Sequence, residues 1–160
     1  MKDKSILIGI VAVLITVNSV AQSIDTFNDS RDGKTYKTVK IGSQTWMAQN
    51  LAFKVDYGVW AYENNPNNVN TYGYLYCWTI ANQVCPDGWH LPNKSEWESL
   101  INTLGKDIGG GKIKEAGIKH WKDPNVGATN ESGFTALPAG YCTFEDGEQV
   151  VKWKYAKDCI

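Results

Sequence analysis

The sequence predicts an α+β fold, with short strands, one clear helix and many turns in a single domain. Two segments rich in β-branched and aromatic residues, 34–41 and 44–47, flank Gly42-Ser43, and an apolar stripe of helical period follows Pro92. Aromatic residues make up 12% of the chain, beside 15 glycines. Such a composition builds its core from large rings and joins short elements by tight turns.

The N-terminus has the order of a cleavable signal peptide, residues 1–21. Lys2 and Lys4 precede an apolar run at 6–15, and Ser19 and Ala21 supply the small side chains that signal peptidase accepts before its cut. We expect cleavage directly after Ala21. The mature protein is then secreted, or lies in the periplasm or on the outer cell surface.

A membrane or lipid anchor is the alternative interpretation of this leader. The apolar run at 6–15 is much shorter than the roughly 20 residues that span a bilayer, and a lipoprotein needs a cysteine directly after the cut, whereas the first cysteine is Cys77. We therefore expect no membrane span in the mature chain. The formal net charge is −1, with no two adjacent lysines or arginines, which argues against nucleic acid as a partner.

The first half of the mature chain predicts a linker, a hairpin and a surface loop. Residues 22–31 are polar and unpatterned, so the folded domain, 32–160, begins after them. Segments 34–41 and 44–47 with a two-residue loop predict a β-hairpin. Residues 57–70 are loop-like, and the aromatic stretch 72–78 has a period that leaves strand and helix both open.

The clearest helix begins after Asn93, which can cap it together with Glu96. Trp97, Leu100, Ile101 and Leu104 form one apolar stripe, and Gly105 ends the helix. We expect this whole stripe to pack against the core.

Beyond the helix, the three glycines at 109–111 predict a flexible join followed by one or two helical turns within 112–119. A phosphate-binding loop is the alternative, but no strand precedes the glycines and no Gly-Lys-Ser/Thr ending follows. Residues 144–151, around Asp146-Gly147, predict a second hairpin.

Four cysteines, Cys77, Cys85, Cys142 and Cys159, are an even number for an oxidising compartment, and we expect two disulfides. A zinc site is the alternative, but no two cysteines have the close spacing of a zinc ribbon or finger, and His90 and His120 stand apart. Three pairings are open, including the local pairs Cys77–Cys85 and Cys142–Cys159.

Several strings together resemble the Fibrobacter succinogenes major paralogous domain, a family of secreted bacterial domains. They are DGKTYKTVKIGSQTWMAQNL (32–51), YGYLYCW (72–78), CPDGWHLPNKSEWESL (85–100), KIKEAGIKHW (112–121) and GATNESGFTALPAGY (127–141). The string HLPNKSEWE also resembles the start of a helix in relatives of formylglycine-generating enzymes. The resemblance covers most of 32–141 and implies a C-type-lectin-like domain with short twisted antiparallel sheets, one or two helices and much ordered loop.

The resemblance also has consequences for the cysteines and for the C-terminus. It implies a pair between Cys85 and Cys159, which leaves Cys77 with Cys142. The family pattern is not recognisable after Tyr141, so we expect an atypical or shortened closing segment with an exposed sheet edge.

Catalytic signals are absent from the sequence. It has no Gly-x-Ser-x-Gly elbow and no HExxH zinc helix. His90 is expected in a strand with a structural role, Glu96 already has a capping role, and oxidation of the formylglycine type needs copper-binding cysteines, whereas these four serve as disulfides. We expect structural roles for Trp46, Trp89, His90, Pro92, Asn93, Glu96 and Trp97, and no enzyme activity.

Binding is the function that the loops favour, through aromatic faces that stack on sugars and amides that bind hydroxyl groups. The candidate ligand-binding residues are Trp60, Tyr62, Asn65, Asn67, Tyr72, Asp123, Asn125, Asn130 and Glu131. The alternatives are that they are core rings and turn formers, and that the domain is a structural or adhesion module. Residues 123–125 resemble the Pro-Asn triplet of calcium-dependent lectins, but without its companion Trp-Asn-Asp, so we expect no cofactor, with calcium a secondary candidate. The expected partner is an extracellular carbohydrate or protein.

Overall fold

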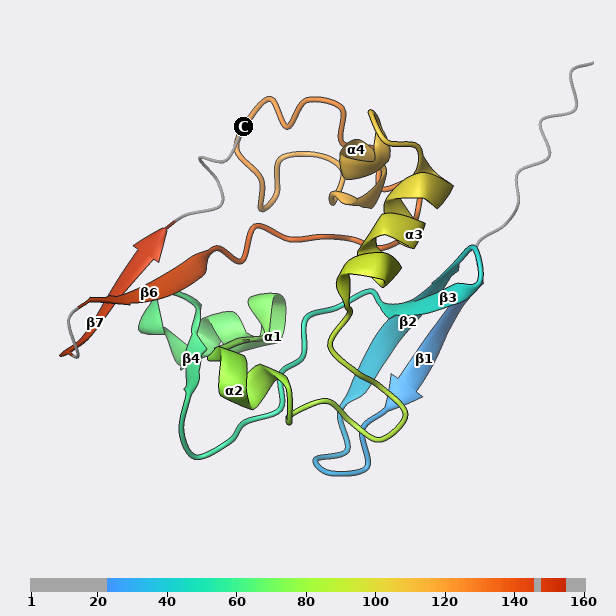
Figure 1. The fold of residues 1–160 in the computed structure, drawn as a ribbon. Coiled ribbons are helices and arrows are strands. Elements are labelled where there is room, and N and C mark those ends of the chain that lie inside the picture. The colour runs from blue at the N-terminus through green and yellow to red at the C-terminus, as the bar shows by residue number, and fades with distance from the viewer. Residues whose placement is uncertain (1–22, 146–147, 155–160) are drawn as a thin grey trace, which may run out of the picture.

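The computed structural model describes residues 23–145 and 148–154, and the expected signal peptide lies outside them. The described residues fold into one three-stranded and two two-stranded antiparallel sheets, with short helices and long connections (Figure 1). The α+β fold is thus confirmed. Within the described part of the chain, no helix is long and apolar enough to cross a membrane.

The first sheet has the order β1-β2-β3. Its strands are β1 (Ile24–Asn28), β2 (Thr35–Ile41) and β3 (Gln44–Met47). The predicted hairpin is β2–β3, which turns at Gly42 with a φ of 61°. The prediction of a linker at 22–31 is wrong for β1, which pairs with β2 along all five of its residues. Its exposed, polar sequence carries no apolar alternation because β1 is an edge strand.

The second sheet pairs β4 (Val59–Ala61) with β5 (Tyr74–Tyr76). Between them, the segment expected as a loop contains two 3-10 turns, Tyr62–Asn64 and Pro66–Asn68, and the one-turn helix α1 (Val69–Tyr72). The short helix α2 (Trp78–Ala81) follows β5.

Helix α3 (Lys94–Leu104) is the predicted helix, and both halves of its capping box are present. The Asn93 side chain accepts from the Glu96 N–H, and the Glu96 side chain accepts from the Asn93 N–H. The apolar stripe is only partly buried. Leu100 and Leu104 are in the core, but Trp97 and Ile101 are 40% and 44% exposed, so the expectation that the whole stripe packs inward is wrong.

The remaining elements are α4 (Gly109–Ile113), β6 (Tyr141–Glu145) and β7 (Glu148–Lys154). The three glycines expected to form a flexible join are the first turn of α4. There Gly111 lies against the carbonyl oxygen of Gly127, so closely that a Cβ would not fit. The expected second hairpin is confirmed by the antiparallel pairing of β6 with β7.

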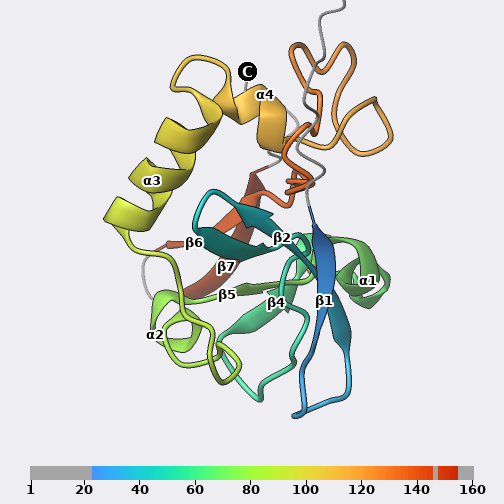
Figure 2. The same cartoon turned by 90° about the vertical axis from the view of Figure 1, so that its right-hand side faces the viewer.

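The core lies between the first sheet and α3. It contains Val39, Ile41, Trp46, Ala48, Leu100 and Leu104, with Ile113 and Phe134 packed at its margin. Seen from the side, α3 and α4 lie on one side of β2–β3, and β4, β5 and α2 lie on the other (Figure 2). The space between these two parts is where the candidate site is found.

Candidate functional site

A cleft of about 670 Å³ opens between the part that holds α3 and the part that holds β5. Its lining is mostly apolar, with seven aromatic rings and a few polar side chains. The aromatic lining residues are Trp46, Tyr72, Tyr74, Tyr76, Trp89, Trp97 and Phe134, and the polar ones include Gln44, Gln49, Asn50, His90 and Glu96. A volume of this size, with few polar groups among apolar walls, is typical of a ligand-binding site.

The wall nearest α3 is a cluster of three rings. The Trp46 ring lies 5.0 Å from Trp97 and 5.8 Å from Phe134, measured between centroids, with tilted planes. Trp46 is buried in the core and holds the cluster in place, whereas Trp97 keeps 40% of its surface exposed. The cluster therefore offers a large ring surface that is fixed by packing behind it.

The opposite wall comes from β5 and from Gln49, Asn50 and Leu51 beside it. The Tyr74 N–H donates to the Leu51 carbonyl over 2.9 Å, and the Tyr76 hydroxyl donates to the Phe53 carbonyl over 2.6 Å. Burial raises the pKa of Tyr76, so its hydroxyl stays protonated and keeps this bond through the physiological range. Tyr72, at the end of α1, completes this side of the lining.

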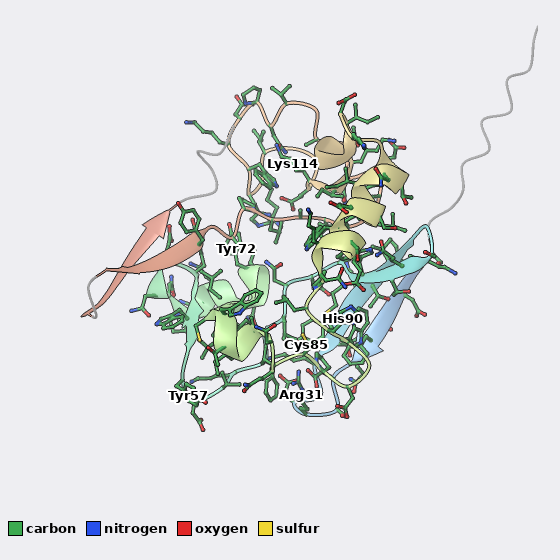
Figure 3. All side chains as sticks on the ribbon, viewed as in Figure 1. Arg31, Tyr57, Tyr72, Cys85, His90 and Lys114 are labelled. Atoms are coloured by element: carbon green, nitrogen blue, oxygen red, sulfur yellow. The ribbon has the colours of Figure 1, made fainter. Side chains whose placement is uncertain are left out.

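A carboxylate and an imidazole lie at the rim of the cleft. The ring Nε2 of His90 lies 2.7 Å from Glu96 Oε1, while Glu96 Oε2 accepts the Asn93 N–H over 2.8 Å. The bond from the Asn93 N–H, reinforced by His90, lowers the pKa of Glu96, so this carboxyl is ionised at neutral pH. Figure 3 shows His90 on the loop before α3 and Tyr72 at the end of α1 as separate parts of the lining.

Two further lining residues, Trp46 and Cys85, carry atoms with hydrogen-bonding capacity. The indole Nε1 of Trp46 is buried and has no acceptor among the residues that the structure describes. The thiol of Cys85 lies 3.8 Å from the Ala81 carbonyl, and burial raises its pKa, so it is protonated and unreactive. An unpaired buried donor is uncommon in proteins and costs about 1 to 3 kcal/mol.

Of the residues predicted to bind a ligand, Tyr72 is the one that lines this cleft. Tyr62 is 3% exposed and packs against Tyr72 at 4.8 Å, so the expectation that its face is available to a ligand is wrong. Trp60 is half-buried within β4, and Asn65 caps the following 3-10 turn by accepting the N–H of Asn67. This loop is therefore held by its own contacts and its polar groups serve as turn formers.

The second predicted group lies on the connections after α4. Asn125 donates to the carbonyls of Glu115 and Gly117, and Asn130 exchanges hydrogen bonds with Thr135, so both amides stabilise loops. Glu131 forms an ion pair with Lys112, and Asp123 is exposed. Among the described residues, no cluster of three or more metal-binding side chains is found.

The structure also bears on four other residues for which the sequence raised expectations. Cys77 and Cys85 are free thiols, so no disulfide that includes either of them is formed, and the side chains of Cys142 and Cys159 lie outside the described part of the chain. His90 is exposed in a loop, which corrects its expected place in a strand. Trp89 has a structural contact, since its ring meets Phe27 of β1 edge-on at 5.3 Å.

Most of the cleft could not be predicted from the sequence, because its residues come from segments that are far apart in the chain. Gln44, Asn50 and Phe134 carry no local signal of binding. The sequence does contain one indication of the site. Trp97 is the one aromatic residue in the apolar stripe of α3, whose other members are aliphatic.

Comparison with known proteins adds a family assignment to this geometry. Residues 39–158 match the family model of the Fibrobacter succinogenes major domain. The match includes the segment after Tyr141, where the resemblance of the sequence strings ends. No curated protein and no solved structure matches the chain. Because the family model covers most of the sequence, the chain belongs to the Fibrobacter succinogenes major domain family.

Proposed function

We propose that the protein is a secreted or cell-surface module, without catalytic activity, which binds an extracellular ligand in the aromatic cleft. The observation that carries this proposal is the ring surface of Trp97, which is exposed within a cleft of about 670 Å³ although it packs on the buried Trp46. Because one side of the Trp97 ring is already held by packing on Trp46, the side chain loses little conformational entropy when a ligand covers its exposed part.

The leader sequence supports the extracellular part of this proposal. A chain with a charged start, an apolar run at 6–15 and a small-residue cleavage site is directed out of the cytoplasm. We take a carbohydrate or a polypeptide as the class of ligand, because either can lie against the flat faces of aromatic rings.

The arrangement at the rim supports a role without catalysis. Both oxygens of Glu96 accept hydrogen bonds, one from the N-cap of α3 and one shared with His90, so this pair has a structural function that explains its position. A general acid needs a raised pKa, whereas the pKa of Glu96 is lowered.

The test is a ligand screen followed by a matched pair of tryptophan variants. The purified, exported protein is screened against arrays of oligosaccharides and synthetic heptapeptides, and each hit is titrated by calorimetry. Trp97→Ala removes the exposed ring of the cleft, and we expect affinity to fall at least about tenfold, as for a binding hot spot. Trp78→Ala is the control, because Trp78 is 74% exposed and does not line the cleft.

Thermal unfolding of both variants establishes that each is folded before the titrations are compared. Equal loss of affinity in the two variants, or a hit that binds Trp97→Ala as tightly as the unchanged protein, contradicts a site in the cleft. A folded protein that binds nothing on either array supports the structural or adhesion module instead.

A further inference from the structure

The cleft runs along the edges of two β-strands, which follows from the order of its lining residues. All four residues of β3, Gln44–Met47, and all three of β5, Tyr74–Tyr76, contribute to the lining. Successive side chains of a strand point to opposite faces of the sheet, so a cavity on one face meets only every second residue. A cavity that meets consecutive residues of a strand lies beside its backbone.

β3 is the edge strand of its sheet, and its pairing with β2 fixes which backbone groups face the cleft. The Ala48 N–H donates to the Lys37 carbonyl, so this pair is hydrogen-bonded, and bonded pairs alternate along an antiparallel ladder. Trp46 is therefore bonded to Val39, whereas Thr45 and Met47 direct their N–H and C=O groups away from β2. Among the described residues these groups have no partner.

β5 is likewise the edge strand that faces the cleft from the other side. The Cys77 N–H donates to the Gly58 carbonyl, so by the same alternation Leu75 is bonded to Trp60, and Tyr74 and Tyr76 turn their backbone groups away from β4. The Tyr74 N–H already donates to the Leu51 carbonyl. The N–H and C=O of Tyr76 have no partner within the part of the chain that is described.

We propose that the cleft is an acceptor for an extended segment of another polypeptide, which adds as a strand to the free edge of β3. This inference rests on the proposed function and names the class of ligand. Thr45 and Met47, two residues apart, present alternating donors and acceptors with the repeat of a β-strand, which an extended peptide matches and a sugar does not.

The surroundings of this edge fit a peptide with apolar side chains at alternate positions. Trp97, Phe134 and Tyr76 line the same cleft as this edge. β3 has four residues, about 13 Å at roughly 3.3 Å per residue, so a short segment covers the edge.

Hydrogen–deuterium exchange of single amides tests the geometry directly. The probe is the tightest binder from an array of synthetic heptapeptides with apolar residues at alternate positions. In the free protein, the Thr45 and Met47 amides should exchange quickly and the Trp46 amide slowly, because only the last is bonded within the sheet. The peptide should slow exchange at Thr45 and Met47 by at least about tenfold and leave Trp46 unchanged.

A pair of variants at one position separates the backbone from the side chain. Thr45→Pro removes the outward N–H of β3 without removing a bond to β2, and proline is tolerated at such an edge position. Thr45→Ala keeps the N–H. We expect the peptide to lose about tenfold in affinity for Thr45→Pro and less than about twofold for Thr45→Ala. The same peptide with alternate amides N-methylated should lose binding to the unchanged protein.

The outcomes distinguish this inference from the proposed function. If oligosaccharides bind in a manner that requires Trp97 and no heptapeptide binds, the cleft is a ligand site but strand addition is wrong. Peptide binding that ignores both Thr45→Pro and N-methylation also overturns strand addition, because it then depends on side chains alone. If neither class of ligand binds the folded protein, the proposed function and the inference fail together.

Discussion

Arg31 holds the carboxylate of Asp29 with two hydrogen bonds, from Nε to Oδ1 at 2.8 Å and from Nη2 to Oδ2 at 2.6 Å. The carboxylate is fully buried, and the guanidinium also donates to the Val84 carbonyl and lies over the ring of Phe53 (Figure 3 labels Arg31). A single side chain thus joins the turn after β1 to the loop after α2.

Breaking this pair should destabilise the protein much more than breaking an exposed ion pair. Arg31→Met leaves the Asp29 carboxylate buried without its cation, and we expect unfolding to become easier by about 2 to 3 kcal/mol, less than for a fully buried pair because Arg31 is partly exposed. Lys94→Ala removes the exposed pair with Glu98 and should cost at most about 0.5 kcal/mol. Urea unfolding measures both, and equal effects would contradict a structural role for Arg31.

The same pair should make stability depend on acid. The hydrogen bonds from Arg31 lower the pKa of Asp29 below its usual 3.8, so the folded protein binds this proton less readily than the unfolded chain. Stability from Asp29 is therefore complete above about pH 4 and is lost as the pH falls through the lowered pKa. Urea unfolding between pH 2 and 6 should show a steeper decline for the unchanged protein than for Asp29→Asn.

Glu96 contributes to acid sensitivity with the same sign, since its pKa is also lowered in the folded state. The decline of stability in Asp29→Asn should therefore persist in part, and Asp29→Asn combined with Glu96→Gln should be flatter still. An unchanged acid profile in the double variant would mean that other carboxyl groups dominate.

The cap of α3 predicts a different pattern of substitution. Asn93→Ala removes the acceptor for the Glu96 N–H, and we expect a loss of about 1 kcal/mol in the free energy of unfolding. Asn93→Asp keeps an oxygen at the same position and should lose little. Thermal unfolding of the two variants measures the difference, and similar melting temperatures would show that the capping bond is unimportant.

Substitutions at Gly73 and Gly88 should separate the effect of backbone strain from that of a steric clash beside the cleft. Both have positive φ, 65° and 80°, but a Cβ at Gly73 would lie 2.6 Å from the Leu51 oxygen, whereas nothing lies within 4 Å of one at Gly88. Gly88→Ala should cost about 1 kcal/mol from backbone strain, and Gly73→Ala about 1 to 3 kcal/mol more from the clash. Chemical unfolding with equal losses at both positions would contradict this packing.

The parts of the fold that the sequence predicts well are those set by neighbouring residues. Asn93 and Glu96 are three residues apart and can satisfy the first turn of α3 by themselves, and Gly42-Ser43 fixes the register of β2 with β3. The strand β1 escapes prediction because an edge strand exposed on both faces needs no apolar alternation.

The candidate site escapes prediction for the opposite reason, since it depends on contacts between distant segments. The period of α3 places Trp97 and Leu100 on one stripe, but the core closes over Leu100 and stops short of Trp97. Tyr62 and Tyr72 look equally suited to stack on a ligand, yet one is buried beneath the other. Composition indicates many rings, and packing alone decides which of them remain open.

The hydrogen bond from Arg31 to the Val84 carbonyl joins a residue outside the region matched by the family model to a residue inside it, because the match begins at Val39. A protein cut at that limit would lose β1, half of β2 and the arginine that joins them to the rest. The packed unit of the structure is therefore larger than the region that the family model matches. Anyone who grafts this domain onto another polypeptide has to carry residues 24–38 with it.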